Sequence, residues 1–369
     1  RRRGYRALSD GMVALATGDA AIASRLARRA DALLKQPPAT QVLSAQAAEA
    51  GGDGGAARRH YEVLMEAPET AFIGVRGLLR QALEAGESTE ALRLARRAYA
   101  LRPSDEWVLN RLFELQVGAA AWNAADATLA EALRRKAVPQ ADGYRQRAAV
   151  LVERGRAAET EDDPTAAMGF MREANDLDPG LAPAAVAYAR YLAEDGKTRR
   201  ATRVLEQAWS TAPHPDIAAA YGTTGANGDP MQRVKNLERL LSLRSDEPEG
   251  HVALGEAALA ARLWGEARNH LEQAAGAAPT ARVCRLMAEL EEAEHGDKEV
   301  AASWLAKAAA APADPGWVCG DCGAVAGGWG AKCGNCGAFA RMKWQAPPRV
   351  AALPPADEAL MALPAAASD

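Results

Sequence analysis

Four cysteines near the C-terminal end have the spacing of a metal site. They form two matching Cys-x-x-Cys-Gly segments, which begin at positions 319 and 333. A Cys-x-x-Cys turn directs both sulfurs toward one ion, and the glycine that follows allows a left-handed backbone that brings N–H groups toward the sulfurs. The pattern predicts a site with four thiolate ligands. These are Cys319, Cys322, Cys333 and Cys336.

Other chemistry for these cysteines is less consistent with the rest of the chain. Two disulfides would need an oxidising compartment, and a thioredoxin-type dithiol would need a βαβ context, and neither is indicated elsewhere in the sequence. Zinc in a closed four-cysteine site is structural, whereas iron would make a rubredoxin-like electron carrier. The sequence leaves zinc and iron open. Cys284, the fifth cysteine, lies on an Ala/Leu-rich helical stretch and is interpreted as a small buried residue.

Aromatic residues gather around the cysteines. A short ribbon needs apolar mass around its metal, and Phe339 with three tryptophans can supply it. We therefore predict a rubredoxin-like or zinc-ribbon module over residues 313–345. The same tryptophans are candidate anchors for a protein partner. They are Trp317, Trp329 and Trp344.

The elements that position this module are predicted from a long repeat. Nine prolines recur at intervals of 31 to 40 residues, with an average near 34. That period is typical of tetratricopeptide repeats, in which two antiparallel helices are followed by a proline. The prolines are Pro37, Pro68, Pro103, Pro139, Pro179, Pro213, Pro248, Pro279 and Pro312. The expected fold is an all-α superhelix of about eight or nine helical hairpins over residues 1–312, followed by the ribbon and a disordered Pro/Ala-rich tail over 346–369.

Small residues recur at fixed distances before successive prolines. Gly255, Ala258 and Ala267 precede Pro279 in this way, and the repeats that end at Pro213 and Pro103 carry alanines at matching places. Repeated small residues indicate a repeated close approach of helices. Two irregular places are expected as well: a longer exposed loop at 159–164 and an interruption of helix at 222–230.

Composition excludes several classes of function. The chain of 369 residues has a formal net charge of −4 and no basic stripe interleaved with aromatics, so nucleic-acid binding is not indicated. No apolar run is long enough to cross a membrane. The start at Arg1-Arg2-Arg3 without methionine leads us to expect an upstream membrane segment, with this whole chain on the cytoplasmic side of a bacterial inner membrane.

No catalytic motif is present, and the chain is predicted not to be an enzyme. Its five histidines are scattered over different repeats, and a nucleophile elbow, a P-loop and a His-Glu-x-x-His helix are all missing from the sequence. A solenoid acts through its concave face, where the first helix of each repeat presents side chains to protein partners. Candidates for a basic stripe that binds an acidic partner are Arg76, Arg80 and Arg190.

Two motifs lie in the first third of the chain. One begins Arg3-Gly4-Tyr5-Arg6-Ala7-Leu8 and continues to Gly18-Asp19-Ala20, and the other runs from Pro68 to Leu78. They resemble the HemY family of tetratricopeptide proteins, in its alphaproteobacterial form. The resemblance implies an inner-membrane protein with a cytoplasmic repeat domain that is associated with late haem biosynthesis.

The C-terminal knuckles are similar to those of lipopolysaccharide assembly protein B (LapB). That second resemblance implies an adaptor that links lipopolysaccharide synthesis to a membrane protease. From the sequence, the favoured function is a membrane-tethered scaffold that organises protein partners in haem (porphyrin) biosynthesis. The alternatives are a LapB-like adaptor and a rubredoxin-type electron carrier.

Overall fold

The predicted repeats are helical hairpins in the computed structural model, which describes residues 1–35, 38–276 and 278–348. The fold divides into two compact units, residues 1–154 and the described residues from 155 onward. The helices of the first unit are α1 (Arg2–Ala16), α2 (Ala20–Leu34), α3 (Pro38–Ala50), α4 (Gly54–Leu64), α5 (Ala71–Glu84), α6 (Ser88–Leu101), α7 (Glu106–Gly118), α8 (Trp122–Arg134) and most of α9 (Gln140–Thr160).

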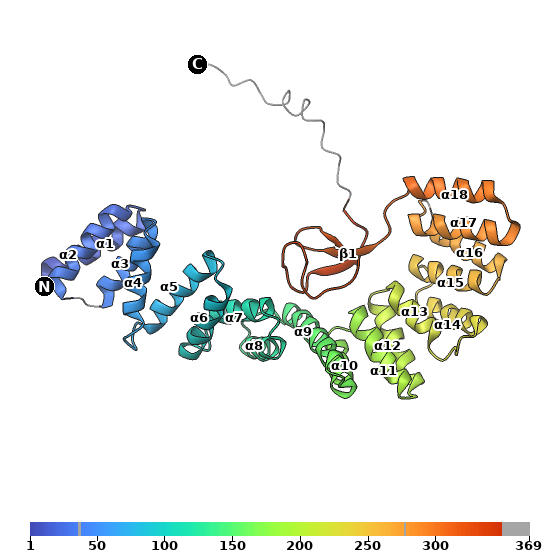
Figure 1. Cartoon of the computed structure of the whole chain (residues 1–369), viewed down its shortest axis with the longest axis horizontal. Coiled ribbons are helices and arrows are strands. Elements are labelled where there is room, and N and C mark those ends of the chain that lie inside the picture. The colour runs from blue at the N-terminus through green and yellow to red at the C-terminus, as the bar shows by residue number, and fades with distance from the viewer. Residues whose placement is uncertain (36–37, 277, 349–369) are drawn as a thin grey trace, which may run out of the picture. The chain divides into compact units, whose positions relative to one another are not determined.

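The second unit carries the remaining helices and all the strands. Its helices are α10 (Pro164–Leu177), α11 (Ala182–Glu194), α12 (Thr198–Thr211), α13 (Pro215–Thr223), α14 (Pro230–Ser242), α15 (Pro248–Ala260), α16 (Trp264–Ala275), α17 (Ala281–His295) and α18 (Lys298–Ala310). Its strands are β1 (Gly316–Cys319), β2 (Val325–Ala326) and β3 (Met342–Gln345). Figure 1 shows these helices as successive hairpins that lead into the small ribbon. The described residues thus form eighteen helices, most of them paired in sequence as hairpins, and a four-cysteine ribbon, as the repeat and the knuckles predict.

The prolines mark the junctions between hairpins. Pro103 follows α6 and Pro179 follows α10, so each lies between the second helix of one hairpin and the first helix of the next. Pro248 differs, because it is the first residue of α15 rather than the end of the preceding hairpin. A proline is tolerated there because the first helical N–H has no intrahelical partner. Pro37 lies outside the described residues, as does most of the tail predicted to be disordered.

Aspartates start many of the helices. The side chains of Asp53, Asp105 and Asp163 accept hydrogen bonds from the backbone N–H three residues later, at 2.8, 3.1 and 2.9 Å. Each bond satisfies a donor that the helix itself cannot, which stabilises the helix by about 1 kcal/mol. The short connection and the cap together define where each hairpin turns.

Small residues let the paired helices approach closely. Ala258 and Ala267 are fully buried, as is Leu271. A Cβ added to Gly255 would lie 2.8 Å from Cδ2 of Leu271, so a larger residue there would force the Leu271 side chain between α15 and α16 to shift. The predicted packing pattern is confirmed here, and the alanines before Pro213 and Pro103 are buried in the same way.

One local prediction is wrong and another is confirmed. The extra residues before Pro164 do not form a longer loop, because α9 continues as helix to Thr160. Alanines and long side chains favour that extension, and Asp163 then caps α10 directly. The interruption predicted at 222–230 is present, since α13 ends at Thr223 after nine residues. No helix in the described parts of the chain has the length and apolar content needed to cross a bilayer.

Candidate functional site

The four cysteines are held by a small antiparallel sheet in the order β2-β1-β3. Trp317 of β1 pairs with Ala326 of β2 and with Trp344 of β3. Cys319 is the last residue of β1, so the first knuckle begins where the central strand ends. The second knuckle lies within a separate turn that is closed by a bridge between Lys332 and Phe339.

The two knuckles have the same backbone geometry. The N–H of Gly323 donates to the carbonyl of Cys319 at 2.9 Å, and the N–H of Gly337 donates to the carbonyl of Cys333 at 3.0 Å. Both glycines have a left-handed backbone, with φ of +71° and +74°. The first cysteine of each knuckle also donates its N–H to the alanine that follows the glycine, at 2.9 and 2.8 Å. The glycines therefore have the role that the sequence assigns to them.

The four sulfurs meet in one cluster. All four Sγ atoms lie within 4.8 Å of one another, and the pairs Cys319–Cys336 and Cys322–Cys333 are both 3.7 Å apart. Sulfurs bound to a tetrahedral zinc at about 2.3 Å stand roughly 3.8 Å from one another. The observed spacing therefore fits one metal ion held by four thiolates. No disulfide links the five cysteines, all of which are free.

The ionisation of the cluster also suits a cation. A hydrogen bond from the Asn335 amide to Cys322 Sγ, at 3.6 Å, is the main reason that the pKa of Cys322 is lowered to about 6. For Cys336 a backbone hydrogen bond from Ala338 acts in the same direction, but burial and the neighbouring sulfurs together raise its pKa to about 12. One cysteine ionises easily, and its negative charge then opposes ionisation of the neighbouring cysteines. A bound divalent cation would offset this repulsion between thiolates.

The ribbon packs against helices of its own unit through two of the predicted tryptophan anchors. The ring of His214, between α12 and α13, lies 5.0 Å from the ring of Trp317 and 4.3 Å from that of Trp344, centroid to centroid. His214 is 2% exposed and Trp317 is 8% exposed. Figure 1 shows the chain running from α18 into the ribbon that carries β1.

The third tryptophan contacts a different helix of the same unit. The Arg156 guanidinium, in the last turns of α9, lies 5.1 Å from the Trp329 ring centroid and donates to the Trp329 carbonyl at 3.5 Å. The linker before β1 is held as well, because Asp314 accepts from the backbone N–H of Arg282 at 2.7 Å and pairs with Arg285 at 2.8 Å. In this structure the three tryptophans thus contact the chain's own side chains, and their predicted role toward a partner stays a prediction.

The predicted arginines are exposed, and each has a neighbour. Arg76 stacks over the Trp107 ring at 5.0 Å, whereas Arg80 pairs with Glu49 and donates to the Tyr61 hydroxyl at 3.3 Å. Arg190 belongs to the second unit, where it pairs with Glu159 at 2.5 Å. The first two line one cavity, and Arg190 does not line it.

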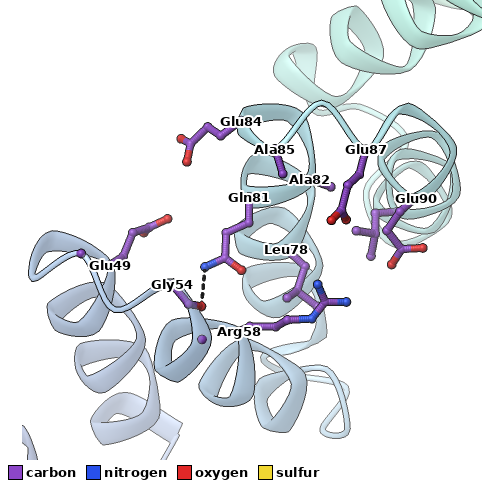
Figure 2. A pocket seen from close by; sticks show the side chains of 13 residues that line it. Glu49, Gly54, Arg58, Leu78, Gln81, Ala82, Glu84, Ala85, Glu87 and Glu90 are labelled. Atoms are coloured by element: carbon purple, nitrogen blue, oxygen red, sulfur yellow. Dashed lines mark hydrogen bonds between the residues drawn. The ribbon is translucent and has the colours of Figure 1, made fainter.

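Two cavities of about 520 Å³ each border α5. The acidic one is lined by Glu49, Glu84, Glu87 and Glu90, and Figure 2 shows their side chains around Gln81, which donates to the Gly54 carbonyl at 3.3 Å. Arg93 pairs with Glu90 at 2.6 Å and so offsets part of this charge. The other cavity is lined by three arginines and three aromatic rings and by no carboxylate. Helix α5 therefore separates an acidic cavity from a basic one.

A histidine pair is a feature that sequence reasoning missed. Nδ1 of His251 lies 3.0 Å from Nδ1 of His270, and Nε2 of His251 lies 2.9 Å from the Ser245 carbonyl. Burial is the main reason that the pKa of His270 is lowered, and the nearby His251 acts in the same direction. The two histidines are 19 residues apart on the facing helices α15 and α16. Only knowledge of which residues face each other across this hairpin could have indicated the pair from the sequence.

Comparison with known proteins identifies the N-terminal segment. Residues 1–52 match a family model described as "HemY protein N-terminus". The chain therefore combines a HemY-like N-terminal segment with tetratricopeptide-type hairpins. A curated relative from Magnetospirillum gryphiswaldense, described as "Probable magnetosome protein Mms48", is 33% identical over 251 residues. The match covers 67% of this chain and 56% of the relative, so the chain spans little more than half of that protein's length.

Several solved structures show some similarity at low sequence identity. Yeast Tom70 is 13% identical with a TM-score of 0.34, over 84% of this chain and 85% of that one. The Naa15/Naa10 complex bound to HypK-THB is 13% identical with a TM-score of 0.48, over 84% of this chain and 51% of that one. A thermophilic TPR protein from Thermus thermophilus is 23% identical with a TM-score of 0.25, over 49% of this chain and 96% of that one.

Proposed function

We propose that this chain is a scaffold that binds protein partners along its helical hairpins and holds one structural metal ion in its C-terminal ribbon. The observation that carries the proposal is that the side chains able to bind a metal gather in the ribbon, while the helical hairpins present extended surfaces. Within the described residues, the four sulfurs are the only cluster of three or more His, Cys, Asp or Glu side chains with the spacing of a metal site. Repeat surfaces bind partners through extended faces rather than through one enclosed site.

The proposed metal ligands are Cys319, Cys322, Cys333 and Cys336. Four thiolates fill the coordination of zinc, which leaves no position for water or substrate, so the metal would hold the ribbon together. The contacts from the ribbon to His214 and Arg156 support a structural role, because they make the ribbon part of the repeat domain.

A rubredoxin-type electron carrier is the second candidate. Cys322 and Cys336 are exposed, and an exposed edge of a four-thiolate site suits electron transfer. The metal decides between the two candidates. For the scaffold we expect about one zinc for each chain and a colourless protein, measured by elemental analysis after expression with zinc and iron both available. An iron-type visible absorption that bleaches on reduction would instead support the carrier.

The HemY-like N-terminal segment supports a proposal about the pathway in which the partner proteins act. We propose that the parent protein is tethered to a bacterial inner membrane, that this chain faces the cytoplasm, and that its partners act in haem biosynthesis. The test is affinity purification of the full-length protein from membranes with identification of the captured proteins. Capture of haem-biosynthesis enzymes is the expected result. Capture of a membrane protease with enzymes of lipopolysaccharide synthesis would support the LapB-like adaptor, for which the cysteine cluster is the shared feature.

A further inference from the structure

The basic cavity beside α5 combines cations and aromatic faces in a way that suits a carboxylate ligand. Six of its lining residues supply these groups, and they come from the helices α4, α5 and α7 and from the residue that follows α6. They are Tyr61, Phe72, Arg76, Arg80, Arg102 and Trp107. A volume of about 520 Å³ is in the range of ligand sites.

Two of the guanidiniums are held in place without an ion pair. Arg76 stacks over Trp107 at 5.0 Å, and Arg102 stacks over Phe72 at 4.2 Å. In the described part of the chain no carboxylate pairs with either one. A stacked guanidinium is oriented by the ring while the N–H groups at its edge remain available, and these match a carboxylate with two parallel hydrogen bonds.

The third guanidinium and a buried tyrosine fix the floor of the cavity. Arg80 is paired with Glu49, and Glu49 also accepts from the Tyr61 hydroxyl at 3.0 Å. Tyr61 is 3% exposed, and a Cβ on Gly77 would lie 2.4 Å from its ring, so the ring cannot tilt toward α5. Arg80 is thus already neutralised, which leaves Arg76 and Arg102 as the arginines of this cavity that have no ion pair with any described residue.

The exposure of the arginines favours a chain segment over a small molecule. Sites for small ligands bury most of the ligand surface. Here the side chain of Arg80 is 49% exposed, and Ile73, one turn before Arg76 on the same face of α5, is 37% exposed. An extended peptide can place alternate side chains along such an open face. Its side chains on one side repeat at about 6.6 Å, which is close to the rise of about 5.4 Å between residues one turn apart on the helix.

We propose that this cavity binds an extended acidic segment of a partner protein, with carboxylates on Arg76 and Arg102 and an apolar side chain against the exposed rim at Ile73. The inference rests on the proposed scaffold function and names the chemistry of the partner. It replaces the predicted stripe of Arg76, Arg80 and Arg190 with a site inside the first unit, because Arg190 belongs to the second unit and is paired there.

The test uses the full chain and a fluorescein-labelled peptide of ten glutamates, with a ten-glutamine peptide as the neutral probe. We expect the glutamate peptide to bind, to lose affinity as salt is raised, and to bind at least about tenfold more weakly to each of Arg76→Gln and Arg102→Gln. Arg76→Lys should weaken binding as well, because lysine keeps the charge and loses the two-point geometry. The glutamine peptide should not bind.

A matched control is the double variant Arg96→Gln, Arg97→Gln, which removes two exposed arginines of α6 outside the cavity. It should change binding less than about twofold, since exposed charges away from a contact contribute little. Far-UV circular dichroism should be unchanged in every variant, because all these side chains are exposed.

Three results would overturn the inference. They are absence of binding at millimolar glutamate peptide, equal weakening by the control variant, and competition by free glutamate as effective as by the peptide, which would make this a small-molecule site. Failure of the scaffold function itself would appear as no specific capture of partners from membranes by the wild type. If the wild type and the Arg76→Gln, Arg102→Gln double variant capture partners equally well, the scaffold stands and this site is excluded.

Discussion

At the scale of single residues, His214 links the ribbon to the repeats. Its Nδ1 accepts from the backbone N–H of Asp216 at 3.1 Å, so the proton of the neutral ring is on Nε2. That nitrogen is buried and finds no hydrogen-bond acceptor among the described residues, and the two tryptophan rings lie against the imidazole. Burial lowers the pKa of His214 to about 4, although the Asp216 carboxylate at 3.6 Å opposes the shift.

The lowered pKa makes contact between the ribbon and His214 sensitive to acid. An exposed histidine takes up a proton near pH 6.5 and the buried one near pH 4, so the packed state loses stability as pH falls through this window. The loss is on the order of 3 kcal/mol. We expect tryptophan emission to shift toward that of exposed rings between pH 6.5 and 4.

His214→Asn is the matched variant, because asparagine can accept the same capping hydrogen bond and does not titrate. Its emission should change less over this pH range. Protonation of the cysteines affects both proteins, so the difference between them isolates His214. Identical pH profiles would show that the histidine is not what makes the contact acid-sensitive.

At the scale of helices, two glycines allow the effect of close packing on stability to be distinguished from the effect of helix propensity. Gly77 of α5 faces the Tyr61 ring, with a Cβ position 2.4 Å from the nearest ring atom, whereas Gly169 of α10 has nothing within 4 Å. Gly77→Ala should lower the free energy of unfolding by about 1 to 3 kcal/mol through overpacking. Gly169→Ala should raise it by about 0.5 to 1 kcal/mol through helix propensity.

Urea unfolding followed by circular dichroism measures both changes. The two substitutions add the same methyl group to a helix, so opposite signs are diagnostic of the neighbouring residue. A neutral Gly77→Ala variant would mean that Tyr61 and its bond to Glu49 can shift at little cost, and the floor of the basic cavity would then be less rigid than the contacts indicate.

At the scale of the whole molecule, the ribbon belongs to one of the two compact units. Its contacts to His214, Arg156 and Arg282 all lie within the unit that begins at residue 155. Because hairpins stabilise mainly their neighbours, loss of the ribbon should be felt locally. If the four cysteines bind a metal, as proposed, removal of that metal should therefore affect the ribbon and the helices that it contacts.

Chelation of the metal, or Cys333→Ser, should unfold the ribbon and leave most of the helical circular dichroism intact. Amide hydrogen exchange should rise in residues 316–345, around α13 and in the last turns of α9. It should stay unchanged in α1 to α8. Cys284→Ser is the control, since this buried cysteine lies on α17 away from the cluster. Faster exchange throughout α1 to α8 would contradict the local effect, and loss of most helicity would show that the ribbon holds the repeats together.

The sequence by itself determined the repeated hairpins and the four-sulfur cluster. Both rest on short-range patterns: a proline at each junction with buried alanines such as Ala258 and Ala267 between helices, and two Cys-x-x-Cys-Gly turns whose glycines have positive φ. Local backbone conformation and the size of a side chain are enough to specify such elements, because each hairpin packs mainly on its neighbours.

Only the tertiary structure decided which side chains from distant parts of the chain meet. His214 and Trp317 lie 103 positions apart in the sequence, Arg156 and Trp329 lie 173 apart, and no periodic pattern relates them. The same holds for Arg102, whose stacking on Phe72 completes the basic cavity, and for Arg190, which belongs to another unit. Such contacts depend on how separate helices and strands pack against one another. The sequence pattern of any one element does not specify that packing.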